Sequence, residues 1–382
     1  MSEQANKLLK NELENREDGL FWDDAVALVA DKCDVKPNTA ETYIRRSDKA
    51  TTETRADGNK YVVSPRATID ETTFDEEHVL KMEVGDRTSD RFASLPILED
   101  VGHPLVPEGH EKGYFRRKVA GKESDINVVT AAMADPDYSV LLEGEAGVGK
   151  DRLILHIAAK TNRPVVRVAA SSNEDLVEIL IGHYSASEDG GFEFRKGLAT
   201  IAVEYGYILI IDEFNMLDGK TQARLNQLLE DADQAKLTIP ETNEVIEPHD
   251  EFIFVATQNP RKVGYGGVES LNMATKSRFY PVEIPALEPT AERNVIANES
   301  NWDADARELD NLLGRGGVIP SLRNLYEIGK ISVWVSTRDV IKIARMAESI
   351  GNVRTASEIV LVGLADPEDK EPIRSAINDR NW

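Results

Sequence analysis

The 382-residue sequence predicts an α/β protein, a parallel sheet with helices on both faces, and three observations support this fold class. Short apolar runs alternate with helical patterns from about residue 113 to 287, as in a sheet whose parallel strands are joined by helices. One of these runs leads through a glycine-rich loop directly into a helix. Only helical patterns remain over 288–382. We therefore expect an α/β domain over 113–287 and a helical lid over 288–382.

The first 112 residues depart from this pattern. Residues 1–65 contain two helical stretches and a strand-like stretch, which predicts a small winged helix-turn-helix-like module. The second helical stretch, at 37–46, is followed closely by Lys49 and itself carries two arginines, so contact with DNA is one interpretation. Docking of a protein partner or of a neighbouring subunit is the other. Residues 66–112 are acidic and irregular, and we interpret them as a linker.

The composition is strongly acidic, with 68 acidic against 45 basic residues and a net charge of −23. This charge argues against broad, nonspecific nucleic-acid binding and resembles proteins of salt-loving archaea or their viruses, which is the origin we expect. No apolar run approaches the roughly 20 residues that span a bilayer, and the N-terminal residues are polar. We expect a cytoplasmic protein without membrane contact. The single cysteine, Cys33, excludes an intrachain disulfide and is interpreted as a core residue on a helix.

The glycine-rich loop has the context of a phosphate-binding loop, between an apolar strand and a helix. Its residues are Gly144, Glu145, Ala146, Gly147, Val148, Gly149, Lys150 and Asp151. Glycines allow backbone N–H groups to surround phosphates, the helix N-terminus adds partial positive charge, and Lys150 places a cation on the β- and γ-phosphates. We expect ATP as the ligand. Asp151 replaces the Ser or Thr whose hydroxyl normally ligates Mg²⁺, which affects the metal geometry and the turnover rate.

Two further strands end in polar side chains. A continuous apolar run over 208–211, typical of a buried central strand, ends in Asp212 and Glu213. Asp212 is expected to face the loop and hold Mg²⁺ together with Asp151, and Glu213 to orient and deprotonate the attacking water. Asn259 follows the next apolar strand and is expected to contact the γ-phosphate or the water. We also expect the strand of Asp212 to be the direct neighbour of the strand that precedes Lys150.

These motifs in this order resemble an AAA+ ATPase of the MoxR and dynein-related branch, which includes CbbQ- and NorQ-type ATPases. Residues 180–197 resemble the helix-2 insertion of that branch, and 225–246 resemble its hairpin before sensor 1. Ser277-Arg278-Phe279 matches the family's arginine-finger position. Ser336-Thr337-Arg338 matches the sensor-2 arginine at the start of a lid helix. The resemblance covers about 113–365 and does not include the N-terminal module.

The resemblance implies an ATP-hydrolysing enzyme that forms a homo-oligomeric ring, with a hexamer expected. Arg278 would reach the nucleotide of a neighbouring subunit, and Arg338 would link the lid to the nucleotide, so that Glu213, Asn259, Arg278 and Arg338 form the catalytic set. The implied activity is chaperone-like remodelling of a protein partner, often one with a von Willebrand factor A domain. Two alternatives stay open. One is a nucleic-acid-directed motor or regulator that uses residues 1–65. The other is a slow nucleotide-gated switch, which Asp151 suggests.

Overall fold

The computed structural model describes residues 20–33, 51–54, 60–63, 82–170, 176–186, 191–260, 271–380 and 382. The chain divides into two compact units, Met1–His78 and Val79–Trp382. Among the described residues, no helix is both long enough and apolar enough to cross a membrane.

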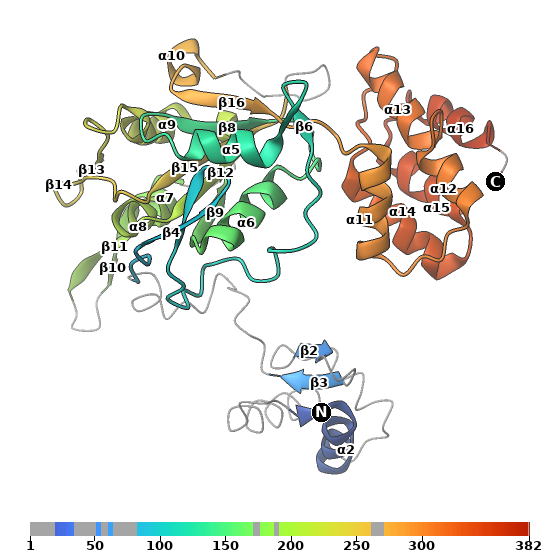
Figure 1. Cartoon of the computed structure of the whole chain (residues 1–382), viewed down its shortest axis with the longest axis horizontal. Coiled ribbons are helices and arrows are strands. Elements are labelled where there is room, and N and C mark those ends of the chain that lie inside the picture. The colour runs from blue at the N-terminus through green and yellow to red at the C-terminus, as the bar shows by residue number, and fades with distance from the viewer. Residues whose placement is uncertain are drawn as a thin grey trace. The chain divides into compact units, whose positions relative to one another are not determined.

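The first unit contains one described helix and three short strands (Figure 1). Their bounds are β1 (Leu20–Phe21), α2 (Trp22–Cys33), β2 (Thr51–Thr54) and β3 (Lys60–Val63). The strands form an antiparallel sheet in the order β1-β3-β2. Cys33 is the last residue of α2, so its place on a helix is confirmed, while its core position stays a prediction. The second predicted helix with Arg45, Arg46 and Lys49 lies outside the described residues.

A five-stranded parallel sheet forms the centre of the second unit, as the sequence predicted. In spatial order its strands are β16 (Phe279–Glu283), β8 (Ser139–Glu143), β15 (Ile253–Gln258), β12 (Ile208–Asp212) and β9 (Val165–Ala169). All residues of β12 are buried, which explains its continuous apolar run. Because all five strands are parallel, their carboxyl ends lie along one edge of the sheet.

One expectation about this sheet was wrong. The strand of Asp212, β12, is not the neighbour of β8, which leads to Lys150, because β15 pairs with both and lies between them. Asp212 is therefore two strand spacings from the glycine-rich loop, about 9–10 Å across the sheet. The end of β15 carries Asn259 into that space. The three polar strand ends still share one edge.

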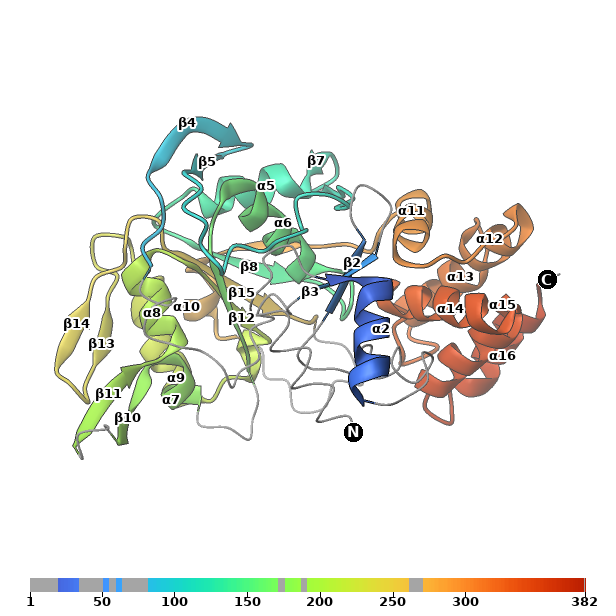
Figure 2. The same ribbon diagram turned by 90° about the horizontal axis from the view of Figure 1, so that it is seen from below.

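Helices cover both faces of the sheet (Figures 1 and 2). Near one face lie α5 (Asp125–Met133) and α6 (Lys150–Thr161), and a core cluster joins their apolar side chains to those of β8, β12 and β15. Near the other face lie α7 (Leu176–Leu180), α8 (Leu198–Tyr205) and α9 (Gly219–Leu225). Short elements complete the domain: β6 (Lys118–Val119), β7 (Glu123–Ser124), the 3₁₀ turns η1 (Phe214–Met216) and η2 (Asn226–Leu229), and α10 (Met273–Lys276).

Residues 82–112 were interpreted as part of a linker, but the structure places them in the folded second unit. They contain an antiparallel hairpin of β4 (Arg87–Phe92) and β5 (Leu95–Leu98). Leu95 belongs to the core cluster of the sheet, and Leu98 is fully buried. Glu251 pairs with Arg87 of the hairpin and with the buried Arg163, which ties the hairpin to the domain.

Two further hairpins project from the domain at the same end (Figures 1 and 2). The first pairs β10 (Gly182–Ala186) with β11 (Phe192–Lys196), and the second pairs β13 (Leu237–Ile239) with β14 (Glu244–Ile246). The second hairpin was predicted from the sequence and is confirmed. The hydroxyl of Tyr184 donates to the carbonyl of Glu241 at 2.9 Å and joins the two hairpins.

The C-terminal region is helical, as predicted, with a core of its own. Its elements are α11 (Pro289–Glu299), α12 (Ala306–Leu313), α13 (Val318–Glu327), α14 (Thr337–Ile350), α15 (Val353–Ser357), the π-helical turn η3 (Glu358–Val362) and α16 (Lys370–Asn378). Ser336 starts α14 with a capping box, in which the Ser336 hydroxyl accepts from the Asp339 N–H and the Asp339 carboxylate accepts from the Ser336 N–H.

Candidate nucleotide-binding site

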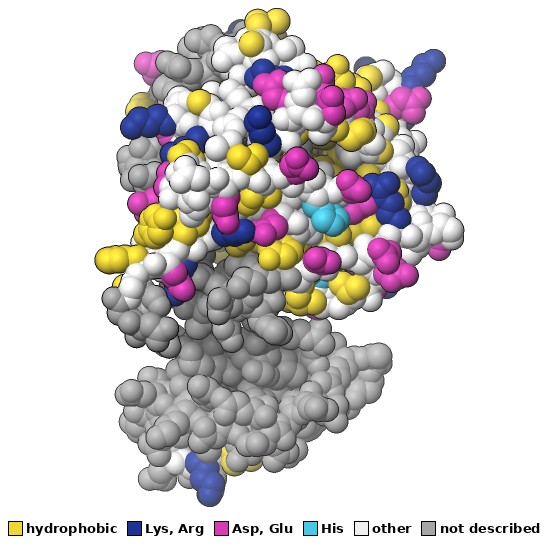
Figure 3. All heavy atoms as spheres, turned by 90° about the vertical axis from the view of Figure 1, so that its left-hand side faces the viewer, with side chains coloured by type: hydrophobic (Ala, Val, Ile, Leu, Met, Phe, Trp, Pro, Cys, Tyr) yellow, Lys and Arg dark blue, Asp and Glu magenta, His cyan; other side chains and the backbone are white. Residues whose placement is uncertain are grey.

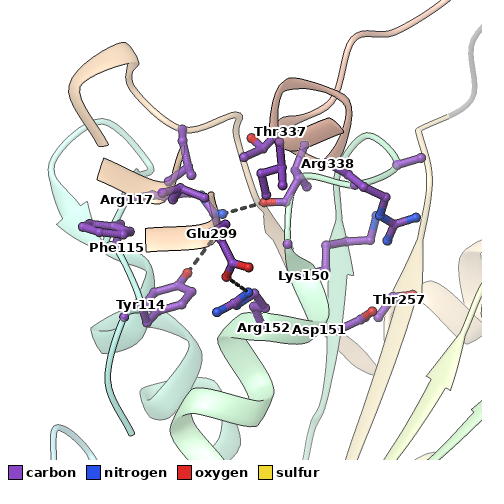
Figure 4. Close-up of a pocket in the computed structure, with 18 of the residues that line it drawn as sticks. Tyr114, Phe115, Arg117, Lys150, Asp151, Arg152, Thr257, Glu299, Thr337 and Arg338 are labelled. Atoms are coloured by element: carbon purple, nitrogen blue, oxygen red, sulfur yellow. Dashed lines mark hydrogen bonds and ion pairs between the residues drawn. The ribbon is translucent and has the colours of Figure 1, made fainter. Parts of the chain in front are cut away.

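The glycine-rich loop connects β8 to α6 and lines a pocket of about 680 Å³ (Figure 4). Gly147 and Gly149 have φ angles of +73° and +93°, in the left-handed region that disfavours other residues. Successive backbone N–H groups in such a turn converge on one concave site and attract anions. A side chain at Gly144 would place its Cβ 2.6 Å from the carbonyl oxygen of Ile284, so glycine is required there by packing.

Lys150 lies buried at the start of α6. Its ammonium group donates to the carbonyl oxygens of Gly144 at 2.6 Å and Glu145 at 3.3 Å, and to Oδ1 of Asn259 at 2.9 Å. Burial lowers the pKa of Lys150, while the surrounding carboxylates, Asp151 and Asp212 first among them, oppose this shift. The site therefore holds a desolvated cation among acceptors, and phosphate oxygens are ligands of the same kind.

Asn259 links Lys150 to Glu213. Its amide nitrogen donates to Oε1 of Glu213 at 3.1 Å while its amide oxygen accepts from Lys150. The backbone of Glu213 has a φ angle of +55°, an uncommon conformation for a non-glycine residue that turns the chain sharply after β12. The hydroxyl of Thr257 donates to the carboxylate of Asp212 at 3.1 Å. The structure thus brings Lys150, at the start of α6, together with Glu213 and Asn259, which follow the strands β12 and β15.

Asp151 and Asp212 share one guanidinium group. Arg167 of β9 binds Asp151 through Nη2 at 2.6 Å and Asp212 through Nε. Burial raises the pKa of Asp151, the negative charge of Asp212 raises it further, and Arg167 opposes both. The sequence analysis missed Arg167. The feature of the sequence that could have indicated it is a charged residue within an otherwise apolar strand, Val165–Ala169.

The pocket has a second wall that the sequence analysis also missed. Gly113, Tyr114, Phe115 and Arg117 line this wall, and Arg117 donates to the carbonyl oxygen of Val148 in the loop and to the hydroxyl of Tyr114 (Figure 4). Tyr114 in turn donates to the buried Asp125 and stacks on His156 of α6 at a ring-centroid distance of 5.1 Å. A run of two aromatic and two basic residues, Tyr114-Phe115-Arg116-Arg117, was the sign in the sequence.

The C-terminal helices contribute the third wall. Thr337 and Arg338 at the start of α14 line the pocket, and a Cβ on Gly147 would lie 2.7 Å from Ser336 (Figure 4). The hydroxyl of Tyr326 donates to the buried carboxylate of Glu145 at 3.0 Å. The loop is therefore in direct contact with the lid on two sides, and Arg338 lies in the pocket where the sequence expected it.

Arg278 lies elsewhere. It precedes β16, and its carbonyl oxygen accepts from the N–H of Ser139, the first residue of β8. The glycine-rich loop follows the last residue of β8, so Arg278 lies at the opposite edge of the sheet, roughly 13–17 Å away along the strand. It pairs with Glu230 at 2.6 Å and does not line the pocket. Its predicted action on the nucleotide of a neighbouring subunit stays a prediction.

The comparisons with known proteins agree with this geometry. A family model described as "AAA domain (dynein-related subfamily)" matches residues 139–279, from β8 to the start of β16. The chain is similar to the protein NorQ of Paracoccus denitrificans (strain Pd 1222), with 32% identity over 241 residues that cover 63% of this chain and 84% of NorQ. The chain belongs to the dynein-related subfamily of AAA ATPases. Membership of this family supports ATP hydrolysis by the domain that contains residues 139–279.

Other relatives of this AAA ATPase differ widely in size. An uncharacterised protein of Staphylococcus epidermidis is 30% identical over 263 residues, which cover 67% of this chain and 96% of that protein. The match to midasin of Dictyostelium discoideum is 32% identical over 162 residues and covers 42% of this chain. The chain spans only 3% of that midasin and 4% of the midasin of Giardia intestinalis.

Proposed function

We propose that this AAA ATPase is a MoxR-type remodelling enzyme that works as a homo-oligomeric ring, a hexamer, and uses ATP hydrolysis to alter the structure of a protein partner. The hydrogen-bonded chain from Lys150 through Asn259 to Glu213 is the observation that carries the proposal. In the proposal, Lys150 on one side of this amide binds phosphate and Glu213 on the other side binds the water.

In this proposal Glu213 is the general base. Its carboxylate takes a proton from water as the water oxygen bonds to the γ-phosphorus and the bond from that phosphorus to the β–γ bridging oxygen breaks, which yields ADP and inorganic phosphate. Asn259 holds the Glu213 carboxylate by a 3.1 Å hydrogen bond and adds no charge beside it. Lys150 and the loop N–H groups hold the β- and γ-phosphates.

Mg²⁺ fits the acidic side of this pocket. The described residues contain no group of three or more His, Cys, Asp or Glu side chains suited to a metal, but Mg²⁺ is usually held by one or two carboxylates together with substrate phosphates. Asp212 and Asp151 provide those carboxylates. When bound there, Mg²⁺ would neutralise charge on the β- and γ-phosphate oxygens.

The apolar part of the pocket suits the adenine ring. Phe115 from the second wall, together with Leu287, Val295 and Ile341 from the lid side, lines this part. A flat heterocycle gains by leaving water for such a surface, and pockets of this size are typical of small-molecule sites. The residues that hold the base would then come from both the α/β domain and the lid.

The two arginines act at different places in this proposal. Arg338 reaches the phosphates within its own chain, because it starts the lid helix that contacts Gly147. Arg278 completes the site of the neighbouring copy after it leaves its 2.6 Å ion pair with Glu230. An arginine supplied in this way stabilises charge on the transferred phosphoryl group.

The two projecting hairpins are the proposed contact with the partner. Phe192, Tyr184 and Val245 expose 79%, 53% and 58% of their surface, although large apolar side chains are normally buried. Hydrophobic side chains lie exposed among charged ones on this end of the molecule (Figure 3). We propose a protein partner with apolar side chains, such as one with a von Willebrand factor A domain.

The net charge of −23 supports a second part of the proposal, that the chain works at high salt, as haloarchaeal proteins do.

A variant that binds ATP without hydrolysing it tests both the ATPase role and the remodelling of a partner. Glu213→Gln should bind a fluorescent ATP analogue as the wild type does and release no phosphate, whereas Lys150→Ala should lose binding. Crosslinking of the Glu213→Gln protein should capture a partner with ATP and not with ADP. Adding Phe192→Ser should abolish capture, and the control Ile359→Ser, at a lid residue that is 52% exposed, should not.

Different results would disprove the catalytic role of Glu213 and the remodelling of a partner. Phosphate release from Glu213→Gln at the wild-type rate would disprove the role of the base. Capture that is equal with ADP, or unchanged by Phe192→Ser, would disprove remodelling through the hairpins and leave the ATPase assignment intact.

A further inference from the structure

Among the residues that the structure describes, Arg167 is the one side chain that pairs with both Asp151 and Asp212. It stands on β9, the edge strand beside β12, and its guanidinium contacts Asp212 at the end of β12 and Asp151 at the start of α6. The Nη2 contact with Asp151 is 2.6 Å, and Nε contacts the carboxylate of Asp212. One planar group therefore spans two oxygen ligands from different elements, which a lysine ammonium group does less well.

These two carboxylates need a cation between them. Both carboxylates contact the guanidinium of Arg167, so their negative charges lie on either side of one group. Lys150 does not bridge them, because its ammonium group donates to Gly144, Glu145 and Asn259. Two like charges this close raise the free energy of the folded chain unless a positive group lies on both.

The positive charge of Arg167 balances the negative charge that Asp151 adds to the site. A hydroxyl residue at position 151 would leave Asp212 as the one carboxylate paired with Arg167. Asp151 adds one negative charge and Arg167 adds one positive charge, so the sum over Asp151, Asp212 and Arg167 is −1. The substitution in the loop is thus compensated from a strand 16 residues further along the chain.

We propose that Arg167 is a tethered counter-ion that holds Asp151 and Asp212 ready for a divalent cation and competes with that cation for their oxygens. This inference rests on the metal role of Asp151 and Asp212 proposed above. Without nucleotide, a divalent cation can bind these carboxylates only by breaking the two charged hydrogen bonds that they accept from Arg167. Arg167 also lines the nucleotide pocket, so phosphate oxygens can accept its N–H groups once a metal takes the carboxylates. Arg167 therefore favours metal together with nucleotide over metal alone.

The probe is Mn²⁺, and free Mn²⁺ is measured by electron paramagnetic resonance during titration of the full chain, with and without ADP. Without nucleotide, Arg167→Gln should bind Mn²⁺ about tenfold more tightly than the wild type, because the two carboxylates lose their competitor. Arg354→Gln is the matched control, since it removes the same charge from a lid residue that bonds Asn378. It should leave Mn²⁺ affinity unchanged.

A double-mutant cycle makes the test specific to Asp151. In an Asp151→Thr background one of the bridged carboxylates is absent, so Arg167→Gln should change Mn²⁺ affinity much less than in the wild type. Arg167→Lys keeps the charge but not the planar pair of donors, and it should give an intermediate affinity. Thermal unfolding of each variant verifies that it is folded, and Arg167→Lys carries the test if Arg167→Gln does not fold.

The outcomes separate this inference from the proposed function. If Arg167→Gln binds Mn²⁺ no more tightly than the wild type without nucleotide, the counter-ion role is wrong even when Mn²⁺ binds normally with ADP. An equal effect of Arg167→Gln in the Asp151→Thr background would also overturn it. If no form of the chain binds Mn²⁺ with ADP, the metal role of Asp151 and Asp212 falls as well.

Discussion

Replacing Gly147 with alanine tests whether the lid packs on the phosphate-binding loop. The new Cβ would lie 2.7 Å from both Cβ and Oγ of Ser336 and 3.5 Å from Cβ of Arg338. Ser336 cannot move easily, because it is buried and its hydroxyl is held by Asp339 at 2.6 Å in the capping box of α14. The backbone of Gly147, with φ at +73°, is also unfavourable for alanine.

Two terms give the magnitude. A non-glycine residue in the left-handed region costs about 1–2 kcal/mol, and overpacking of a filled site costs about 1–3 kcal/mol. Gly351→Ala is the matched control, since Gly351 has φ at +67° and no atom within 4 Å of a new Cβ. Gly147→Ala should therefore lose about 1–3 kcal/mol more in the free energy of unfolding than Gly351→Ala.

The same clash should weaken ATP binding. If the loop and α14 separate to relieve it, Arg338 in the first turn of α14 moves away from the pocket together with that helix. Urea unfolding followed by circular dichroism measures the stability term, and titration with a fluorescent ATP analogue measures affinity. Equal losses of stability for the two alanine variants, with unchanged ATP affinity in both, would refute the contact between lid and loop.

Three other predictions follow from the site and the core. Arg278→Ala should bind ATP without hydrolysing it, and mixing it with Glu213→Gln should restore partial activity; no rescue in demonstrated mixed assemblies would contradict an arginine that acts between copies. Arg163→Ala should lower the free energy of unfolding by about 3–5 kcal/mol, because the buried Glu251 would lose its buried partner and keep only the exposed Arg87, and an unchanged urea midpoint would contradict this. Asp151→Thr should bind ATP more tightly than the wild type at low salt, whereas parallel salt titrations would show that Asp151 does not act on the nucleotide.

Local signals in the sequence were enough for much of the site. Lys150 was predicted because strand, glycine loop and helix follow one another within a few residues, and Asp212 because a fully buried strand must read as a continuous apolar run. Both features depend on neighbouring residues only. The parallel sheet and the helical C-terminal region were predicted for the same reason.

Features that depend on distant contacts were not predicted. The position of β15 between β8 and β12 is set by pairing of strands that are far apart in the chain, and spacing along the sequence does not specify it. The hydrogen bond between Tyr326 and Glu145 joins residues 181 positions apart. The hairpin in 82–112 was taken for a linker because its first strand, Arg87–Phe92, is mostly charged or polar and its pairing with β5 is irregular.

The opposite placement of Arg278 and the glycine-rich loop gives each copy of the chain a direction. A contact that joins the Arg278 edge of one copy to the nucleotide edge of another is heterologous. In an open row of copies, one Arg278 edge and one nucleotide edge stay without a partner, and only a closed ring pairs them all. In such an assembly the Arg278→Ala and Glu213→Gln substitutions inactivate the sites of different copies. A copy with Arg278→Ala inactivates the site of its neighbour and keeps its own, whereas a copy with Glu213→Gln inactivates only its own site. A copy with both changes inactivates two adjacent sites, so activity would depend on the order of the copies as well as on their number.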